Sequence, residues 1–200
     1  HKQYKEFLRK NMSNYASKNL KVGKKIYESE SDTNSTNMSL AYLLKSEKRF
    51  YAPVVPAVDA YTYQCSIKVS SDDLARMASV LANEGVNPVS KKRLLSKEQT
   101  TYILNNVLPE GLYEYSDDWI ARTGGRAFAK SGVGGGLLIV LPDICGIGIV
   151  SPPLDKHGNS VKGIAAGVKL SKKLAEPVFS KRTLKRKNKG KKKTRRRKKK

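Results

Sequence analysis

The stretch KSGVGGGLLIVLPDICGIGIV, residues 130–150, decides the fold class of this chain. Residues 136–141 and 146–150 are almost continuously apolar, and Pro142-Asp143 between them is a typical turn pair. The glycines and Pro142 exclude a membrane-spanning helix in this stretch. We therefore predict a β-hairpin whose strands are buried on both faces, as near-continuous apolar runs indicate.

Helices are predicted on both sides of this hairpin. Residues 71–85 carry apolar side chains on one face at helical spacing and end in a glycine. Ser96 and Gln99 form a capping-box sequence, which predicts a second helix over residues 96–107. A final helix is predicted over residues 159–174. The apolar face of the first helix consists of Leu74, Met77, Ala78 and Leu81.

The N-terminal third has a mixed pattern. Residues 1–20 predict an amphipathic helix, and residues 27–37 are polar and predict a loop. Residues 38–46 predict a buried helix, whereas two prolines within residues 50–58 predict irregular backbone. The order of helices, then a strand pair, then a helix predicts an α+β domain with an antiparallel sheet flanked by helices.

Basic residues are concentrated at the C-terminus. The formal net charge is +23, but 15 of the 40 Lys and Arg residues lie within residues 181–200, which hold no acidic residue. The first 180 residues therefore carry 25 basic against 17 acidic residues, a charge of +8. We predict a globular domain over residues 1–176. Residues 177–200 are predicted to be a disordered low-complexity tail, because such a composition cannot bury a core.

The two cysteines indicate the compartment. Cys65 and Cys145 lie in apolar stretches without a C-x-x-C motif, so we interpret both as small buried residues of a reducing environment. No charged-then-apolar signal segment follows His1. These features predict a cytoplasmic location.

Lys130-Ser131-Gly132 gives the first indication of chemistry. A Lys-Ser/Thr-Gly triplet at the start of a strand is an element of serine β-lactamases and penicillin-binding proteins. The lysine supplies positive charge for a carboxylate or a developing anion, and the following glycines let a substrate approach the strand backbone. Taken alone, the triplet is a weak signal, and an ordinary glycine-rich strand entry is the favoured interpretation.

Six segments follow one another along the chain: SESDTNSTNMSLAYLL (29–44), YTYQCS (61–66), DDLARMASVLANEGVNP (72–88), GLYEYS (111–116), KSGVGGG (130–136) and SPPLDKHGNSVKG (151–163). Together and in this order they closely resemble the glutaminase family, whose β-lactamase-like members hydrolyse glutamine. The resemblance spans roughly residues 15–175 and implies a β-lactamase/transpeptidase-like fold. It also implies hydrolysis of L-glutamine to L-glutamate and ammonia through a serine acyl-enzyme, without a metal or organic cofactor, in a homo-oligomer such as a dimer or tetramer.

The resemblance implies three residues that bind L-glutamine from the N-terminal part of the chain. Glu30 resembles the ligand of the substrate α-amino group, since a carboxylate suits an ammonium; a solvated surface charge is the alternative. Asn37 resembles the partner of the α-carboxylate, and a helix N-cap is its alternative or additional role. Tyr61 resembles a tyrosine that lines the substrate pocket, with an ordinary core or surface aromatic as the alternative.

Two further residues would act at the reacting amide. Tyr113 resembles the tyrosine beside the nucleophile, whose phenol could relay a proton or hydrogen-bond the leaving nitrogen. Val133 resembles the residue whose backbone N–H forms part of an oxyanion hole. Lys130 is expected to supply positive potential without a defined step. His157 is expected to be solvated, and His1 is the only other histidine, which argues against a Ser-His-Asp triad.

The nucleophile motif of the family, S-x-x-K, has no match, because no serine here is followed by lysine three residues later. This motif belongs N-terminal to Glu30, and the 29 residues that precede Glu30 are too few to hold it and the segment that follows it. We therefore expect a C-terminal portion of a glutaminase, with the N-terminal part of the fold missing. Such a portion should be nearly inactive, since losing a serine nucleophile costs about 10⁶-fold in kcat. The sequence departs from the family pattern at two further places. Thr36 stands where the family usually has arginine, and residues 121–129 form a slightly longer segment, which affects the expected distance between Tyr113 and Val133.

Two alternatives to an enzyme remain open. The chain could be a catalytically dead, glutaminase-like binding protein. Residues 181–200 could instead bind nucleic acid or another anionic surface, with a steep salt dependence. The same tail could act as a nuclear targeting signal or be a simple low-complexity extension.

Overall fold

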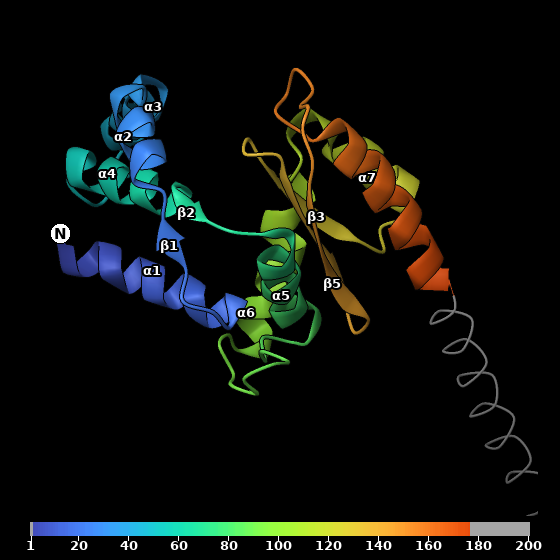
Figure 1. Cartoon of the computed structure of the whole chain (residues 1–200). Coiled ribbons are helices and arrows are strands. Elements are labelled where there is room, and N and C mark those ends of the chain that lie inside the picture. Colours follow the sequence, from blue (N-terminus) through green and yellow to red (C-terminus); the bar gives the residue numbers. More distant parts are fainter. Residues whose placement is uncertain (1, 177–200) are drawn as a thin grey trace, which may run out of the picture. The chain divides into compact units, whose positions relative to one another are not determined.

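The computed structural model describes residues 2–176, so the predictions for the tail at residues 177–200 lie outside the described residues. The described residues divide into two compact units, with the boundary between residues 73 and 74 (Figure 1). Each unit is described by itself. No helix among the described residues is long and apolar enough to cross a membrane.

The first unit is built mainly from helices. Its elements are α1 (Lys2–Ala16), β1 (Lys21–Val22), α2 (Lys24–Asp32), α3 (Ser35–Ser46), α4 (Val54–Cys65) and β2 (Ile67–Lys68). Helices α1, α2 and α3 all pack against α4. The strands β1 and β2 pair antiparallel, with Lys21 opposite Lys68 and Val22 opposite Ile67. A small core forms between α3 and α4 from Ala41, Val54 and Val58.

Three predictions for this unit are wrong in part. Residues 27–37 are not a loop, since α2 covers most of them, and none of its residues is buried. The helix predicted over residues 38–46 exists within α3, but only Ala41 of that helix is buried. Helix α4 begins inside the stretch predicted to be irregular, because Pro53 occupies the N-cap and Pro56 the first turn, where a missing N–H costs no intrahelical hydrogen bond.

A polar cluster joins three helices of the first unit. The Lys5 ammonium of α1 lies 2.6 Å from an Asp59 carboxylate oxygen of α4 and donates to the Tyr27 hydroxyl of α2 at 2.7 Å. Tyr27 donates to Asp59 in turn. The same ammonium lies 4.8 Å from the ring centre of Tyr27 and 5.5 Å from that of Tyr63. Burial alone would raise the pKa of Asp59, but the hydrogen bonds from Lys5 and Tyr27 outweigh it and lower that pKa.

We expect Asp59→Asn to lower the free energy of unfolding by about 1–2 kcal/mol, since it weakens charge-assisted hydrogen bonds. A carboxyl with a lowered folded-state pKa stabilises the fold above the ordinary carboxyl pKa of about 4, and this contribution is lost as the pH falls through the folded value. The difference between the two proteins should therefore shrink below about pH 4. Urea unfolding at pH 7 and pH 3 measures it, with Asp32→Asn on the exposed end of α2 as the matched control.

The second unit is a sheet covered by helices. Its helical elements are α5 (Ser71–Ala82), α6 (Lys97–Tyr102), the π-helical turn η1 (Ile103–Val107), the 3-10 turns η2 (Leu108–Glu110) and η3 (Tyr113–Tyr115), α7 (Ser116–Thr123) and a last helix over residues 161–176. The sheet has the order β3 (Phe128–Gly132), β4 (Gly136–Leu141) and β5 (Cys145–Val150), all antiparallel.

The two faces of β4 pack against different helices. Leu137, Ile139 and Leu141 are fully buried in a core that includes Trp119 of α7 and Val168 of the last helix. The other face of the sheet, through Val140, packs with Ala78 and Ala82 of α5 and Leu108 of η2. Figure 1 accordingly shows α5 and α6 on one side of the sheet and the last helix, in orange, on the other. The unit is an α+β arrangement with an antiparallel sheet flanked by helices.

Most predictions for the second unit are confirmed. Helix α5 begins at Ser71, the capping box of Ser96 and Gln99 is present, and the β4–β5 hairpin turns at Pro142-Asp143. Asp143 adopts a φ of 60°, as tight turns often require. Burial on both faces holds for β4 but not for β5, whose residues are mostly half-buried.

The prediction that both cysteines are buried is wrong for Cys65 and is met only in part by Cys145. Cys65, the last residue of α4, is exposed. Cys145 is half-buried at the start of β5, and burial raises the pKa of its thiol. Neither cysteine forms a disulfide.

Candidate functional site

The predicted site residues fall into two groups, one in each unit. Glu30, Asn37 and Tyr61 belong to the first unit, and Tyr113 and Val133 belong to the second.

Glu30 and Asn37 lie on neighbouring helices of the first unit. Glu30 is exposed near the end of α2, where its carboxylate faces solvent. Asn37 is the third residue of α3 and is half-buried. The alternative of Asn37 as an N-cap is wrong, because Asn34 occupies that position. Asn37 therefore lies in the first turn of α3, where backbone N–H groups have no intrahelical acceptor.

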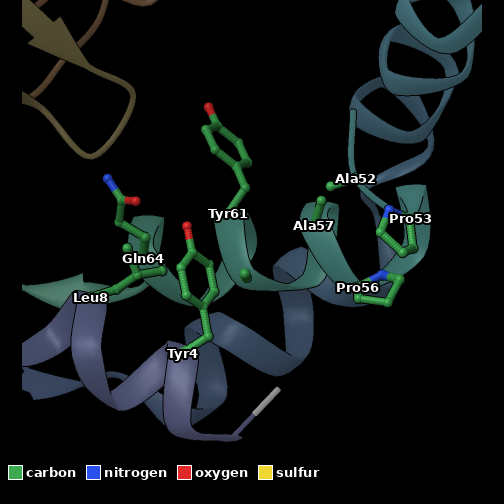
Figure 2. A pocket seen from close by; sticks show the side chains of 9 residues that line it. Tyr4, Leu8, Ala52, Pro53, Pro56, Ala57, Tyr61 and Gln64 are labelled. Carbon is green, nitrogen blue, oxygen red and sulfur yellow. The ribbon is translucent and has the colours of Figure 1, made fainter. Parts of the chain in front are cut away.

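Tyr61 lines a groove of about 610 Å³ between α1 and α4 (Figure 2). The Tyr61 side chain is 53% exposed, and Figure 2 shows it pointing away from α4. The groove can accommodate apolar groups, with polar atoms supplied by two tyrosines and one amide. Neither Glu30 nor Asn37 lines it, so the structure does not bring these three residues into one pocket. The lining residues are Tyr4, Leu8, Ala52, Pro53, Pro56, Ala57, Ala60, Tyr61 and Gln64.

Tyr113 in the second unit lies directly against Lys130. The Lys130 ammonium is 5.0 Å from the centre of the Tyr113 ring, within the range of a cation–π contact. The ammonium also donates to the Ser131 carbonyl at 2.7 Å, which orients the side chain. Tyr113 remains 45% exposed. The sequence assigned Lys130 no step, and the structure places its positive charge over the ring whose phenol was predicted to move a proton.

Val133 lies in the turn that joins β3 to β4. The Gly135 N–H donates to the Gly132 carbonyl at 2.9 Å and closes this turn. The N–H of Val133, the second residue of the turn, is not used by that hydrogen bond, and the Val133 side chain is 69% exposed. This geometry suits a backbone donor for an anion.

A backbone contact connects this hairpin to the segment before Tyr113. The Ser131 N–H donates to the Gly111 carbonyl at 3.1 Å. Gly111 is needed there, because a Cβ atom would lie 1.9 Å from the Ala129 carbonyl oxygen. The longer segment before β3 is held by Trp119, whose indole N–H donates to the Ala127 carbonyl at 2.8 Å. Tyr113 and the Lys130–Val133 strand end therefore belong to one locally braced site.

His157 was predicted to be solvated, and this holds only in part, because its side chain is 30% exposed and contacts an acidic residue. Its Nδ1 lies 2.9 Å from a carboxylate oxygen of Glu114, the residue after Tyr113. Its backbone N–H donates to the Asp155 carboxylate at 2.9 Å. Backbone hydrogen bonds, first of all from Asn159, lower the pKa of Asp155. Nothing in the local sequence pattern indicated the pair of Glu114 and His157, because the two residues lie on separate segments.

The described residues hold no cluster of three or more His, Cys, Asp or Glu side chains suited to a metal ion. The expectation that no cofactor is needed continues to rest on the resemblance.

Comparisons with known proteins establish the family. The family model described as Glutaminase matches residues 1–179, and the chain therefore belongs to the glutaminase family. The chain is 42% identical over 165 residues to the glutaminase of Colwellia psychrerythraea, covering 82% of this chain and 52% of that protein. It is 41% identical over 164 residues to glutaminase 1 of Escherichia coli, with the same shares of 82% and 52%. Glutaminase 1 of Bradyrhizobium diazoefficiens is 42% identical over 159 residues, 80% of this chain and 26% of that protein.

Solved structures agree with this assignment. The Bacillus subtilis glutaminase YbgJ, in covalent complex with 5-oxo-L-norleucine, superposes with a TM-score of 0.78 at 29% identity, covering 84% of this chain and 59% of that chain. The probable glutaminase ybaS gives a TM-score of 0.74 at 41% identity, covering 78% of this chain and 50% of that chain. The chain thus spans about half the length of several of its relatives and is a partial glutaminase.

Proposed function

We propose that this chain supplies the glutamine-binding side of a serine-dependent glutaminase of the β-lactamase/transpeptidase-like class, completed by a segment that carries S-x-x-K. The observation that carries the proposal is the site at the β3–β4 turn. Tyr113, Lys130 and the Val133 turn are assembled there in a chain that belongs to the glutaminase family. The covalent 5-oxo-L-norleucine in the Bacillus subtilis relative supports a ligand of the glutamine type.

The reaction is an acyl transfer. The serine of the completing segment attacks the side-chain amide carbon of L-glutamine, ammonia leaves, and water hydrolyses the glutamyl ester to L-glutamate. The N–H of Val133 stabilises the oxyanion, and one such donor contributes about 3 kcal/mol. The Tyr113 phenol relays a proton to the leaving nitrogen, with the Lys130 charge beside its ring. Glu30 binds the substrate ammonium, and Asn37 binds its carboxylate.

The binding half of this proposal can be tested on the full 200-residue chain. Titration with L-glutamine, followed by calorimetry or NMR, should show saturable binding, while ammonia release stays at background. Binding without ammonia release separates a binding role from an active enzyme. The absence of any saturable response to L-glutamine would overturn the proposal.

Glu30→Gln is expected to weaken L-glutamine binding about 10- to 100-fold, because it removes a charged acceptor worth about 1.5–3 kcal/mol. Glu28→Gln is the matched control, since Glu28 is equally exposed on α2. A ligand without the α-amino group, glutaramate, should bind the wild-type chain and Glu30→Gln equally. Equal L-glutamine affinities for the two variants would contradict the role of Glu30.

A further inference from the structure

We infer that the segment Asp155–Asn159 is a brace for Tyr113, and that Asn159 and His157 are positioning residues for its phenol. This inference rests on the proposed function for its catalytic meaning. Its structural content stands on the contacts of the second unit alone.

The backbone of Tyr113 requires support. Its φ is 55°, in the left-handed region that a non-glycine residue rarely adopts. A residue held in this region persists only where the surrounding structure over-determines it, and such residues gather at functional sites. Contacts on both sides of Tyr113 must therefore fix its conformation.

Asn159 supplies the contact on the N-terminal side. Its side chain is fully buried, and its Nδ2 donates to the Leu112 carbonyl at 3.1 Å. The Leu112 N–H donates to the Ser116 hydroxyl at 3.0 Å. The backbone N–H and C=O of Leu112, the residue before Tyr113, are therefore both hydrogen-bonded. Asn159 is itself held, because its backbone N–H donates to the Asp155 carboxylate at 2.9 Å.

His157 supplies the contact on the C-terminal side through its 2.9 Å pair with Glu114. Glu114 is exposed, so this pair acts as a light restraint rather than as a main source of stability. Residues 112 and 114, which flank Tyr113, are thus both held by the same short segment.

The same segment also reaches the proposed oxyanion turn. A Cβ atom at Gly158 would lie 3.2 Å from a methyl carbon of Val133, so the brace passes close to this residue. Asp155–Asn159 therefore spans from the Val133 turn to both neighbours of Tyr113. We infer that it sets the spacing between the phenol and the oxyanion donor.

The experiment uses the full chain labelled with ¹³C at the tyrosine rings. The Tyr113 resonance is assigned by its loss in Tyr113→Phe. Asn159→Asp keeps the shape of the side chain but replaces the donor to Leu112 with an acceptor, and it should shift or broaden the Tyr113 resonance. Glu114→Gln changes the side chain that contacts His157 at an exposed position without disturbing the core, and it should move the same resonance by a smaller amount.

Two controls make the result specific. Asn87→Asp changes another fully buried asparagine that organises a turn, and Glu110→Gln removes an exposed carboxylate from the same part of the chain. Neither should move the Tyr113 resonance. Fluorescence of the single tryptophan, Trp119, verifies that each variant is folded, and Glu114→Gln decides the question if Asn159→Asp does not fold.

An unmoved Tyr113 resonance in folded Asn159→Asp and Glu114→Gln would overturn the brace, as would equal movement in the two controls. The readout needs no substrate. A chain that fails to bind L-glutamine but shows the Tyr113 shifts would refute the proposed function and retain the brace. A chain that binds L-glutamine without these shifts would retain the proposed function and refute the brace.

Discussion

Fusing this chain behind the N-terminal half of Escherichia coli glutaminase 1 is expected to produce an enzyme that releases ammonia from L-glutamine. The chain matches 52% of that relative at 41% identity, so the remaining portion of the relative complements it in length. The expected gain over the chain alone is about 10⁶-fold in kcat, the amount that a missing serine nucleophile typically costs. A coupled ammonia assay on the fusion and on the unfused chain measures this gain.

Three substitutions in the fusion test which residues take part in catalysis. Alanine in place of the S-x-x-K serine should return ammonia release to the level of the chain alone. Tyr113→Phe should lower kcat by about 10²- to 10⁴-fold, the usual range for a lost proton relay. Tyr102→Phe, at another exposed tyrosine, should leave kcat unchanged. A folded fusion that binds L-glutamine but releases no ammonia would refute the catalytic assignment of the residues in this chain.

Hydrophobic periodicity predicted the second unit well because its elements bury one face or both. Helix α5 places apolar side chains against the sheet, and most residues of β4 are buried. Hydrophobic periodicity predicted the first unit less well. Helix α2 has no buried residue, so its polar sequence carries no periodic signal that distinguishes a helix from a loop. Helix α2 contacts α4 and is joined to it by the hydrogen bond from Tyr27 to Asp59, a contact that no local pattern specifies.

The candidate site likewise contains residues that the sequence predicts and contacts that it does not. Lys130 and Val133 lie within one short motif, and a motif can be recognised from the sequence alone. Three other contacts of the site join segments that are distant in sequence. They are the contact of Lys130 with the Tyr113 ring, the pair of Glu114 and His157, and the hydrogen bond from Asn159 to Leu112. No local pattern specifies such contacts, because they depend on how the sheet and its flanking helices pack.

Gly146→Ala is expected to cause the largest loss of stability among single substitutions in the β4–β5 hairpin, about 3 kcal/mol or more. A Cβ atom at Gly146 would lie 2.2 Å from the Ser79 backbone N and 2.6 Å from the Ala75 carbonyl oxygen. Both atoms belong to the backbone of α5, which cannot move aside as a flexible side chain would. Overpacking of this kind typically costs about 1–3 kcal/mol, and more where backbone must shift.

The matched control is Gly132→Ala, because a Cβ atom at Gly132 meets nothing within 4 Å. Urea unfolding followed by Trp119 fluorescence should show a much lower midpoint for Gly146→Ala and a nearly unchanged midpoint for Gly132→Ala. Equal midpoints would mean that α5 does not pack on the sheet at this distance. Since α5 and the sheet enclose the core behind β3, the same displacement would also loosen the strand that carries Lys130. Loss of the Tyr113 contact should therefore accompany the loss of stability in Gly146→Ala.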